Sequence, residues 1–146
     1  MIIAFSSSNT PSSLAVRADT FSKWSHCGIV TPDNTVIEAV VPRVREVSMG
    51  QFMDGNGKVE LSALLCVHDV KAIRFARTQI GKPYDFGAIL GLGIQRDWHN
   101  PNRWFCSELV TASAEYAGTF WFRQGELWRV TPGDLWMLAP AKFQVA

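Results

Sequence analysis

The chain has 146 residues, enough for one domain with a hydrophobic core, and 47% of them are hydrophobic. Its 14 Lys and Arg residues are balanced by 13 Asp and Glu residues, so there is no positive excess of the kind that binds nucleic acid. The three cysteines include no CxxC pair, which argues against a disulfide scaffold or a zinc site, and we expect neither a metal nor another cofactor.

The sequence shows no signal for export and no membrane segment. Its first residues, MIIAFSSS, lack a basic region, and their apolar run is too short for a secretory signal. The longest apolar stretch, residues 86–94 (FGAILGLGI), is about half of the roughly 20 residues that a membrane helix needs. We therefore expect a cytoplasmic protein, which would reach a cell-wall substrate by lysis or through a partner. The sequence does not indicate an oligomeric state.

The first 67 residues are predicted to be mostly strands. A short strand and a helix opened by Ser and Pro come first, and residues 25–41 then hold two β-rich runs joined by PDN, which indicates a hairpin. Another strand, a Gly/Asn/Asp turn and a third β-rich run follow. The expected segments are 2–5 (strand), 6–21 (helix), 25–41 (hairpin), 44–48 (strand), 49–58 (containing the turn) and 59–67 (strand).

Helices dominate the rest of the chain. Residues 68–81 place Val70, Ile73, Ala76 and Ile80 at helical spacing and end in Gly81, a typical C-terminal stop. Strands and helices mix without regular βαβ alternation. The predicted fold is therefore α+β, a mostly antiparallel sheet packed against a few helices, in a single domain of residues 1–146. The remaining segments are 106–118 (helix closed by Gly118), 131–138 (short capped helix) and 142–145 (closing strand).

Cys106 is the candidate nucleophile, because it begins a helix of small residues that can pack closely on a sheet. The unpaired amides and the positive dipole end there favour a thiolate, and the amides of Cys106 and Ser107 could hold an oxyanion. At 100° per residue, Glu108 points to the far side of the helix, where it would stabilise the helix start or pair with an arginine. The alternative is a buried, inert thiol, the role expected of Cys27 and Cys66.

Three histidines compete as the base that a cysteine nucleophile needs. His68 lies between a strand and a helix, where a capping or surface role is expected. His99 lies in a polar loop shortly before Cys106 and could reach it, but no regular element supports it. His26 lies inside a predicted strand, where a mobile surface histidine would be out of place, and this position favours His26 as the base.

The hairpin register connects His26 with Glu38. If Pro32–Asn34 form a three-residue loop, Glu38 stands opposite Gly28, on the same face as His26 and diagonal to it. Gly28 has no side chain to block the approach. A partner would also explain a carboxylate within the apolar run VIEAVV. With a two-residue loop, Glu38 would lie on the other face of the sheet. His26 would then be a core residue, and Glu38 would be exposed to solvent on an edge strand.

The motifs GKPYDFG (residues 81–87) and WFCSELV (residues 104–110) resemble those of NlpC-type cysteine peptidases, a papain-like superfamily. In ordinary members the cysteine precedes the histidine, whereas here WSHCGIV and VIEA lie upstream and no histidine follows Cys106. This order resembles the circularly permuted branch, the YiiX-like proteins and their relatives around lecithin–retinol acyltransferase. The matching motifs span most of the chain, from the Ser-rich start to the late TPGDL.

The resemblance implies a papain-like fold with the nucleophile at a helix N-terminus. It implies Cys106 as nucleophile, His26 as general base and acid, and Glu38 as the residue that orients the imidazole. Tyr84 matches the family tyrosine near the nucleophile, whose phenol would donate a hydrogen bond to the oxyanion or substrate. A buried aromatic with a satisfied hydroxyl is the alternative for this residue. The residues before and two after the cysteine differ from the usual Asp and Gly, which weakens the case for a muropeptide-like substrate.

The predicted function is thiol hydrolysis of an amide bond, in a peptide or a cell-wall-type peptide, through a Cys-His-Glu triad. Two alternatives use the same fold: a lipid acyl hydrolase or acyltransferase, and a non-catalytic binding module. Residues 86–94 and the loop around Trp98 and Trp104 motivate the lipid alternative. The candidate substrate contacts are Trp24, Trp104 and Phe105. A metal protein is disfavoured, because no ligand pairs occur at zinc spacing.

Overall fold

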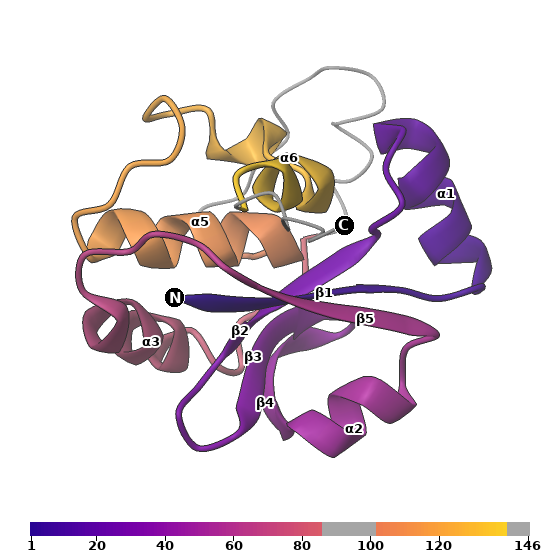
Figure 1. The fold of residues 1–146 in the computed structure, drawn as a ribbon, viewed down its shortest axis with the longest axis horizontal. Helices are drawn as coiled ribbons and strands as arrows, with labels where there is room; N and C mark the ends of the chain where they lie inside the picture. Colours follow the sequence, from indigo (N-terminus) through magenta and orange to yellow (C-terminus); the bar gives the residue numbers. More distant parts are fainter. Residues whose placement is uncertain (86–101, 140–146) are drawn as a thin grey trace, which may run out of the picture.

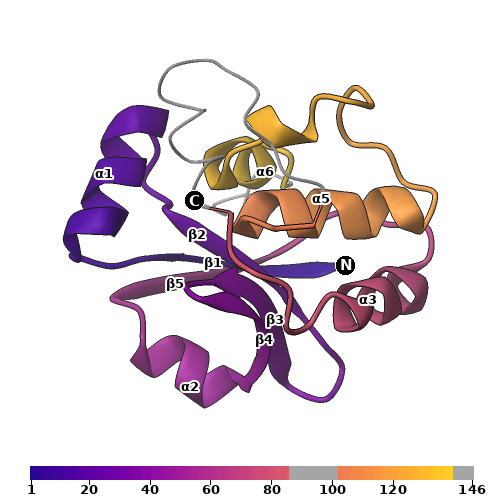
Figure 2. The ribbon, with the colours of Figure 1, turned by 180° about the vertical axis from the view of Figure 1, so that it is seen from behind.

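The computed structural model describes residues 1–85 and 102–139. Its centre is a five-stranded antiparallel sheet in the order β4-β3-β2-β1-β5 (Figures 1 and 2). The predicted α+β class, with an antiparallel sheet and packed helices, is confirmed. The strands are β1 (Ile2–Ser7), β2 (His26–Val30), β3 (Thr35–Val40), β4 (Arg43–Ser48) and β5 (Lys58–Ala63).

The helices lie on both sides of this sheet, as Figures 1 and 2 show. Three of them, α3, α5 and α6, pack on one side and enclose the main hydrophobic core, whereas α2 covers a small cluster on the other side. Helix α1 stands at one end of the sheet. The helices are α1 (Pro11–Thr20), α2 (Met49–Asp54), α3 (Asp69–Thr78), α5 (Cys106–Tyr116) and α6 (Pro132–Met137), with a 3-10 turn, η1 (Leu127–Arg129), before α6.

Helix α5 is buried along most of its length, which fixes its first residue against the sheet. Its small side chains allow it to contact β2, β3, α3, η1 and α6. Its hydroxyl groups are satisfied internally: Ser107 donates to the Val130 carbonyl at 2.6 Å, and Thr111 donates to the Ser107 carbonyl at 2.8 Å. A buried helix with no unpaired hydroxyl in these turns has little freedom to shift, so it can position a reactive group closely.

The hairpin of β2 and β3 has the register expected from the sequence. Val30 pairs with Val36, and the Thr31 N–H donates to the Thr35 carbonyl at 2.9 Å, so residues 32–34 form the three-residue loop. Gly28 then lies against Glu38, because a Cβ placed on Gly28 would be 3.4 Å from the Glu38 Cβ.

The helix ends also follow the predicted signals. Gly81 and Gly118 have positive φ angles of 92° and 85°, the left-handed conformation expected just beyond a helix C-terminus. Thr131 caps α6 and forms a capping box with Asp134. Among the helices in residues 1–85 and 102–139, none is both long and apolar enough to span a membrane.

Two expectations for the strand-rich half need correction. Residues 49–54 form α2, because Ser48 and Gln51 make a capping box and Phe52 packs under the sheet; the expected turn follows at residues 55–57. Strand β5 ends at Ala63 and not at residue 67; beyond it, Leu64 still exchanges backbone hydrogen bonds of 2.9 and 2.8 Å with Met1.

The apolar stripe expected on α3 is only half buried. Ile73 and Ala76 face α5 in the core, whereas the side chains of Val70 and Ile80 are 68% and 45% exposed. In the part of the chain that the structure describes, α3 packs mainly against α5. The expected strand at 142–145, the apolar residues 86–94, Trp98 and His99 lie outside the described residues.

Because Gly28 lies so close to β3, Gly28→Ala is expected to destabilise the protein by about 1–3 kcal/mol. The added Cβ would lie 2.6 Å from Val36 Cγ1 and 3.0 Å from the Ile37 carbonyl oxygen, both in the buried sheet. Urea unfolding followed by circular dichroism measures the change. Gly50→Ala, in α2 with no atom nearer than 3.9 Å, is the control and should be neutral or stabilising. Equal stability of both variants would contradict the close packing.

Candidate active site

Cys106 is the first residue of α5 and is almost fully buried against the sheet. Phe105, just before it, has an extended backbone (φ −105°, ψ 170°), so the helix begins abruptly at the cysteine. Glu108 accepts a hydrogen bond from the Phe105 N–H at 3.4 Å, which agrees with its predicted role at the helix start. The amides of the first turn have no acceptor within the helix, and their dipoles favour a negative charge on the Cys106 sulfur.

His26 begins β2 and connects Cys106 with Glu38. Its ring stacks on Phe52 of α2, with 6.0 Å between ring centroids, and its Nε2 lies 2.6 Å from Glu38 Oε2. Since Nε2 is occupied by Glu38, Nδ1 is the ring nitrogen left to interact with Cys106. Burial by itself lowers the pKa of His26, but the hydrogen bonds and charges of Cys106 and Glu38 outweigh it and raise the pKa to about 10.

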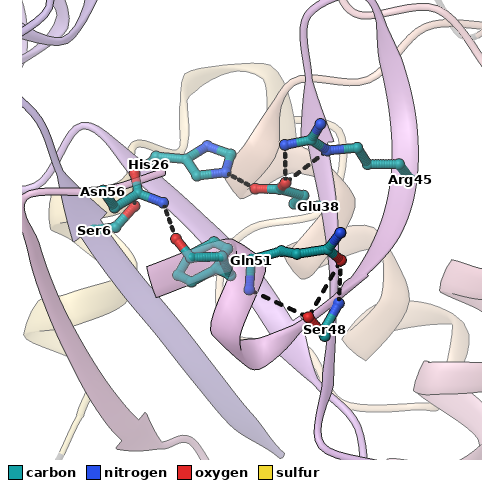
Figure 3. Close-up of polar contacts among 8 residues, drawn as sticks. Ser6, His26, Glu38, Arg45, Ser48, Gln51 and Asn56 are labelled. Atoms are coloured by element: carbon teal, nitrogen blue, oxygen red, sulfur yellow. Dashed lines mark hydrogen bonds and ion pairs between the residues drawn. The ribbon is translucent and has the colours of Figure 1, made fainter. Parts of the chain in front are cut away.

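Glu38 is a buried carboxylate shared between two positively charged groups, as Figure 3 shows. Its second oxygen, Oε1, accepts a hydrogen bond from Arg45 Nε at 2.8 Å and lies 2.8 Å from Arg45 Nη2. Arg45 stands directly opposite Glu38 in the β3–β4 pair. Burial by itself raises the pKa of Glu38, but the bonds from His26 and Arg45 outweigh it and lower the pKa, so the carboxylate stays ionised.

Cys27 also acts on Cys106, from the strand β2 on which the helix of Cys106 packs. It follows His26 on β2, and because side chains alternate along a strand, it lies in the core on the α5 side. The thiol and the backbone N–H of Cys27 both lower the pKa of the Cys106 thiol. The bond from the Cys27 thiol is the main cause that lowers the pKa of Cys106 well below its ordinary value; burial opposes the shift, and His26 adds to it.

The negative charge of this thiol pair belongs on Cys106. Burial and the neighbouring charge of Cys106 raise the pKa of Cys27 well above its usual range, so Cys27 remains a thiol that donates. Cys106 has the helix N-terminus and the imidazolium of His26, whereas Cys27 lies within a strand, which has no comparable dipole. The sequence correctly predicted that Cys27 is buried, but the expectation of an inert core thiol missed its contact with Cys106.

Arg45 is the other partner that the sequence analysis missed, although a signal was present. The expected strand at residues 44–48 lies just after the two-residue connection Val41–Pro42, and pairing across that connection places residue 45 opposite residue 38. Cys27 could have been noticed as well, because its strand neighbour His26 was already a candidate for contact with the same sulfur.

Tyr84 is brought to the site by the segment that follows α3. Its backbone N–H donates to the Pro42 carbonyl at 3.0 Å, and the Asp85 N–H donates to the Trp104 carbonyl at 2.9 Å. The segment therefore joins the start of β4 to the residues just before Cys106. Burial, followed by the negative charge of Cys106, raises the pKa of Tyr84 well above its usual range, so the phenol stays protonated and able to donate.

The three candidate substrate contacts are core residues. Trp104 donates its indole N–H to Gln79 Oε1 at 3.2 Å, and the ring of Trp24 lies 6.2 Å from that of Phe5. Both tryptophans and Phe105 are buried. Their burial gives no support to a role in substrate binding, which stays a prediction. His68 is exposed at the start of α3, apart from the cluster around Cys106.

The nucleophile candidate begins a buried helix that packs on an antiparallel sheet, and the histidine of that sheet comes earlier in the chain. This arrangement defines a circularly permuted papain-like protein. The sequence comparison agrees: residues 3–126 match the permuted papain-like amidase enzymes, YaeF/YiiX, C92 family. The chain belongs to this family, as its motif order predicted. The members of this family are described as permuted papain-like amidase enzymes.

Among solved structures, the chain is similar to the crystal structure of the metalloprotein YiiX from Escherichia coli O157:H7, with a TM-score of 0.65 and 28% sequence identity. The match covers 80% of this chain but 64% of that one, so the present chain spans less than two thirds of the length of YiiX. No curated protein sequence matches this chain. Within residues 1–85 and 102–139, no three His, Cys, Asp or Glu side chains are grouped so that they could hold a metal ion.

The lowered pKa of Cys106 predicts its reactivity. Alkylation by iodoacetamide should be much faster at Cys106 than at Cys27 or Cys66, and its rate should change little between about pH 6 and pH 8. For an ordinary thiol the thiolate fraction rises about tenfold per pH unit in this range. Peptide mass spectrometry measures each rate. His26→Ala should make the labelling rate of Cys106 depend more strongly on pH, because it removes one of the causes that lower the pKa of this thiol; slow, equal labelling of all three cysteines would contradict the thiolate.

The raised pKa of His26 predicts the effect of its carboxylate partner. Glu38→Gln removes the negative charge beside the ring, so the imidazolium loses stability and the pKa of His26 should fall by about one to three units. Titration of the His26 ring protons by NMR measures the shift. Glu46→Gln, on β4 and bonded to Arg77 and not to His26, is the matched control and should leave this pKa unchanged. The same pKa in both variants would contradict the pairing.

Proposed function

We propose that this protein hydrolyses an amide bond in a peptide substrate through Cys106, His26 and Glu38. One observation carries the proposal: His26 Nε2 lies 2.6 Å from Oε2 of the buried Glu38, and the interaction of His26 with Cys106 raises the pKa of the imidazole and lowers that of the thiol. Membership in a family of permuted papain-like amidases supports the reaction class. A binding module would have no need to keep a buried thiolate and imidazolium, whose separate burial is costly.

In the first step the thiolate of Cys106 attacks the carbonyl carbon of the scissile amide. The oxyanion that forms accepts hydrogen bonds from the amides of Cys106 and Ser107 at the start of α5. Tyr84, held as a neutral phenol near the sulfur, is placed to donate a further bond. The His26 imidazolium then gives its proton to the leaving amine, and an acyl-enzyme remains on the sulfur.

In the second step neutral His26 takes a proton from water, whose oxygen attacks the thioester and releases the acid. Glu38 keeps the ring oriented through Nε2 and stabilises its positive charge before and after the transfer. Arg45 fixes the other oxygen of Glu38, so the carboxylate cannot rotate away from the ring. Glu38 and Arg45 therefore act as positioning residues, and the bonds that form and break lie at Cys106 and His26.

An amide substrate is favoured over a lipid acyl group. The preference comes from the family, since its members are described as amidases. The apolar wall that motivated the lipid alternative was expected at residues 86–94, which lie outside the described residues. No described residue provides a separate observation in favour of a lipid.

A substrate panel tests this proposal. Short peptides with L- and D-amino acids and acyl esters are offered to the wild-type protein, and the expected result is turnover of peptides. Cys106→Ala should abolish turnover, and His26→Ala should lower kcat/KM by at least about 100-fold. His68→Ala, an exposed histidine at the start of α3, is the control and should leave kcat/KM unchanged.

Two results would contradict parts of this proposal. Turnover of acyl esters with none of any peptide would replace the amide substrate by a lipid or ester. Loss of turnover in His99→Ala, with His26→Ala still active, would show that His26 is not the base. Circular dichroism of each variant establishes that a loss of turnover is not a loss of folding.

A further inference from the structure

Phe52 of α2 covers one face of the His26 ring, and the proposed reaction as described gives it no role. Its side chain is only 2% exposed, and its ring stacks on the imidazole with 6.0 Å between ring centroids and 29° between ring planes. With Ala4 and Val36 it forms the small cluster under α2, apart from the main core. This cluster therefore places an aromatic ring against the base, on the side of the sheet away from α5.

The contact with Glu38 does not by itself fix the imidazole. Nε2 of His26 lies 2.6 Å from Glu38 Oε2, and this contact holds one atom of the ring. The ring can still turn about the line from its Cβ to that atom, and such a turn changes the direction in which Nδ1 points. A flat ring packed against the imidazole restricts this rotation, because stacking fixes a plane whereas the hydrogen bond fixes a point.

The end of α2 is tied to the strand that lies beside His26. Ser6 pairs with His26 in the β1–β2 ladder, and its hydroxyl donates to Asn56 Oδ1 at 2.9 Å (Figure 3). The side-chain amide of Asn56 in turn donates to the Phe52 carbonyl at 2.6 Å. These bonds join the backbone of Phe52 to the residue paired with His26, so the two stacked rings are held from both sides.

We propose that Phe52 is a positioning residue for the general base: its ring holds the plane of the His26 imidazole for proton transfer, and Asn56 keeps Phe52 in place. The inference rests on the proposed function, because it assigns a task within the reaction that uses His26. This task differs from that of Glu38, which stabilises the charge of the imidazolium, since a benzene ring carries no net charge. Loss of the ring should therefore act mainly on kcat.

Phe52→Leu tests the inference, because it removes the aromatic plane and keeps an apolar side chain. On the peptide that the wild type cleaves fastest, kcat should fall about 10-fold with little change in KM, because a misplaced base slows proton transfer more than it weakens binding. The pKa of His26, followed by NMR without substrate, should also fall, since a loosened ring loses part of its interaction with Glu38. Phe52→Tyr keeps the plane and should retain kcat within about twofold, even where its hydroxyl lowers stability.

Two further variants separate positioning from packing. Val47→Ala is the matched control, because Val47 packs against the same cluster from β4. It should lower stability and leave kcat and the pKa of His26 unchanged. Asn56→Ala keeps the ring but removes its tie to Ser6, so kcat and this pKa should both fall, by less than in Phe52→Leu.

The inference requires kcat and the pKa of His26 to fall together in Phe52→Leu, with circular dichroism establishing that the variant is folded. Either value at the wild-type level, or an equal fall in Val47→Ala, would show that Phe52 is a packing residue only. Should Phe52→Leu not fold, Asn56→Ala is judged by the same two values.

The proposed function is tested separately by the turnover of the wild type. If the wild type cleaves no peptide, the amidase proposal fails. A fall of the His26 pKa that is confined to Phe52→Leu and Asn56→Ala would still support the hold of Phe52 on the ring, because that measurement uses no substrate.

Discussion

The site depends on one constraint: a negative charge on the buried sulfur of Cys106 must be stabilised without water. An isolated ion in a protein interior costs many kcal/mol, so each favourable contact matters. The start of α5 supplies amide dipoles, His26 supplies a positive charge, and Cys27 supplies hydrogen bonds. All three act on one atom, and they can do so only if the first residue of α5 has a fixed place. The buried, small-residue surface of α5 is therefore a requirement of the chemistry as well as of the packing.

Beyond the sulfur, charges of alternating sign run through the sheet. The Cys106 thiolate is followed by the His26 imidazolium, the Glu38 carboxylate and the Arg45 guanidinium, which ends the row at the surface with 54% of its side chain exposed. Each inner group lies between two of opposite sign, so the four sum to zero. Without the guanidinium, the three buried groups would carry a net negative charge, and burial would favour taking up a proton. The arginine therefore helps to keep Glu38 ionised, although two residues separate it from the nucleophile.

The sequence predicted those parts of the site that depend on local rules. The length of the turn determined the β2–β3 register and with it the contact of His26 with Glu38. The position of Cys106 at the N-terminus of a helix identified it as the nucleophile. Arg45 and Cys27 were missed for different reasons. The arginine follows from a second hairpin register, a local rule that was not applied. The Cys27 contact depends on how α5 docks on β2, and these elements are separated by most of the chain. No pattern within either segment encodes that docking. In sequence, a strand cysteine that only fills the core therefore looks the same as one that acts on the nucleophile. Helix α2 was overlooked because six residues are too short to show periodicity, and only its capping box identifies it.

Two consecutive residues of β2 reach the same sulfur, which needs a physical explanation because neighbours on a strand point to opposite faces. The β2–β3 ladder supplies it: its recorded pairs are Ile29 with Ile37 and Val30 with Val36, so the first three residues of β2 have no ladder partner on β3. Where the ladder stops, His26 and the backbone N–H of Cys27 both lower the pKa of Cys106, while the His26 ring stacks on Phe52 of α2. The missing side chain of Gly28 keeps β3 close enough for Glu38 to hold that ring. The end of the ladder thus allows two consecutive residues of β2, His26 and Cys27, to act on the same sulfur.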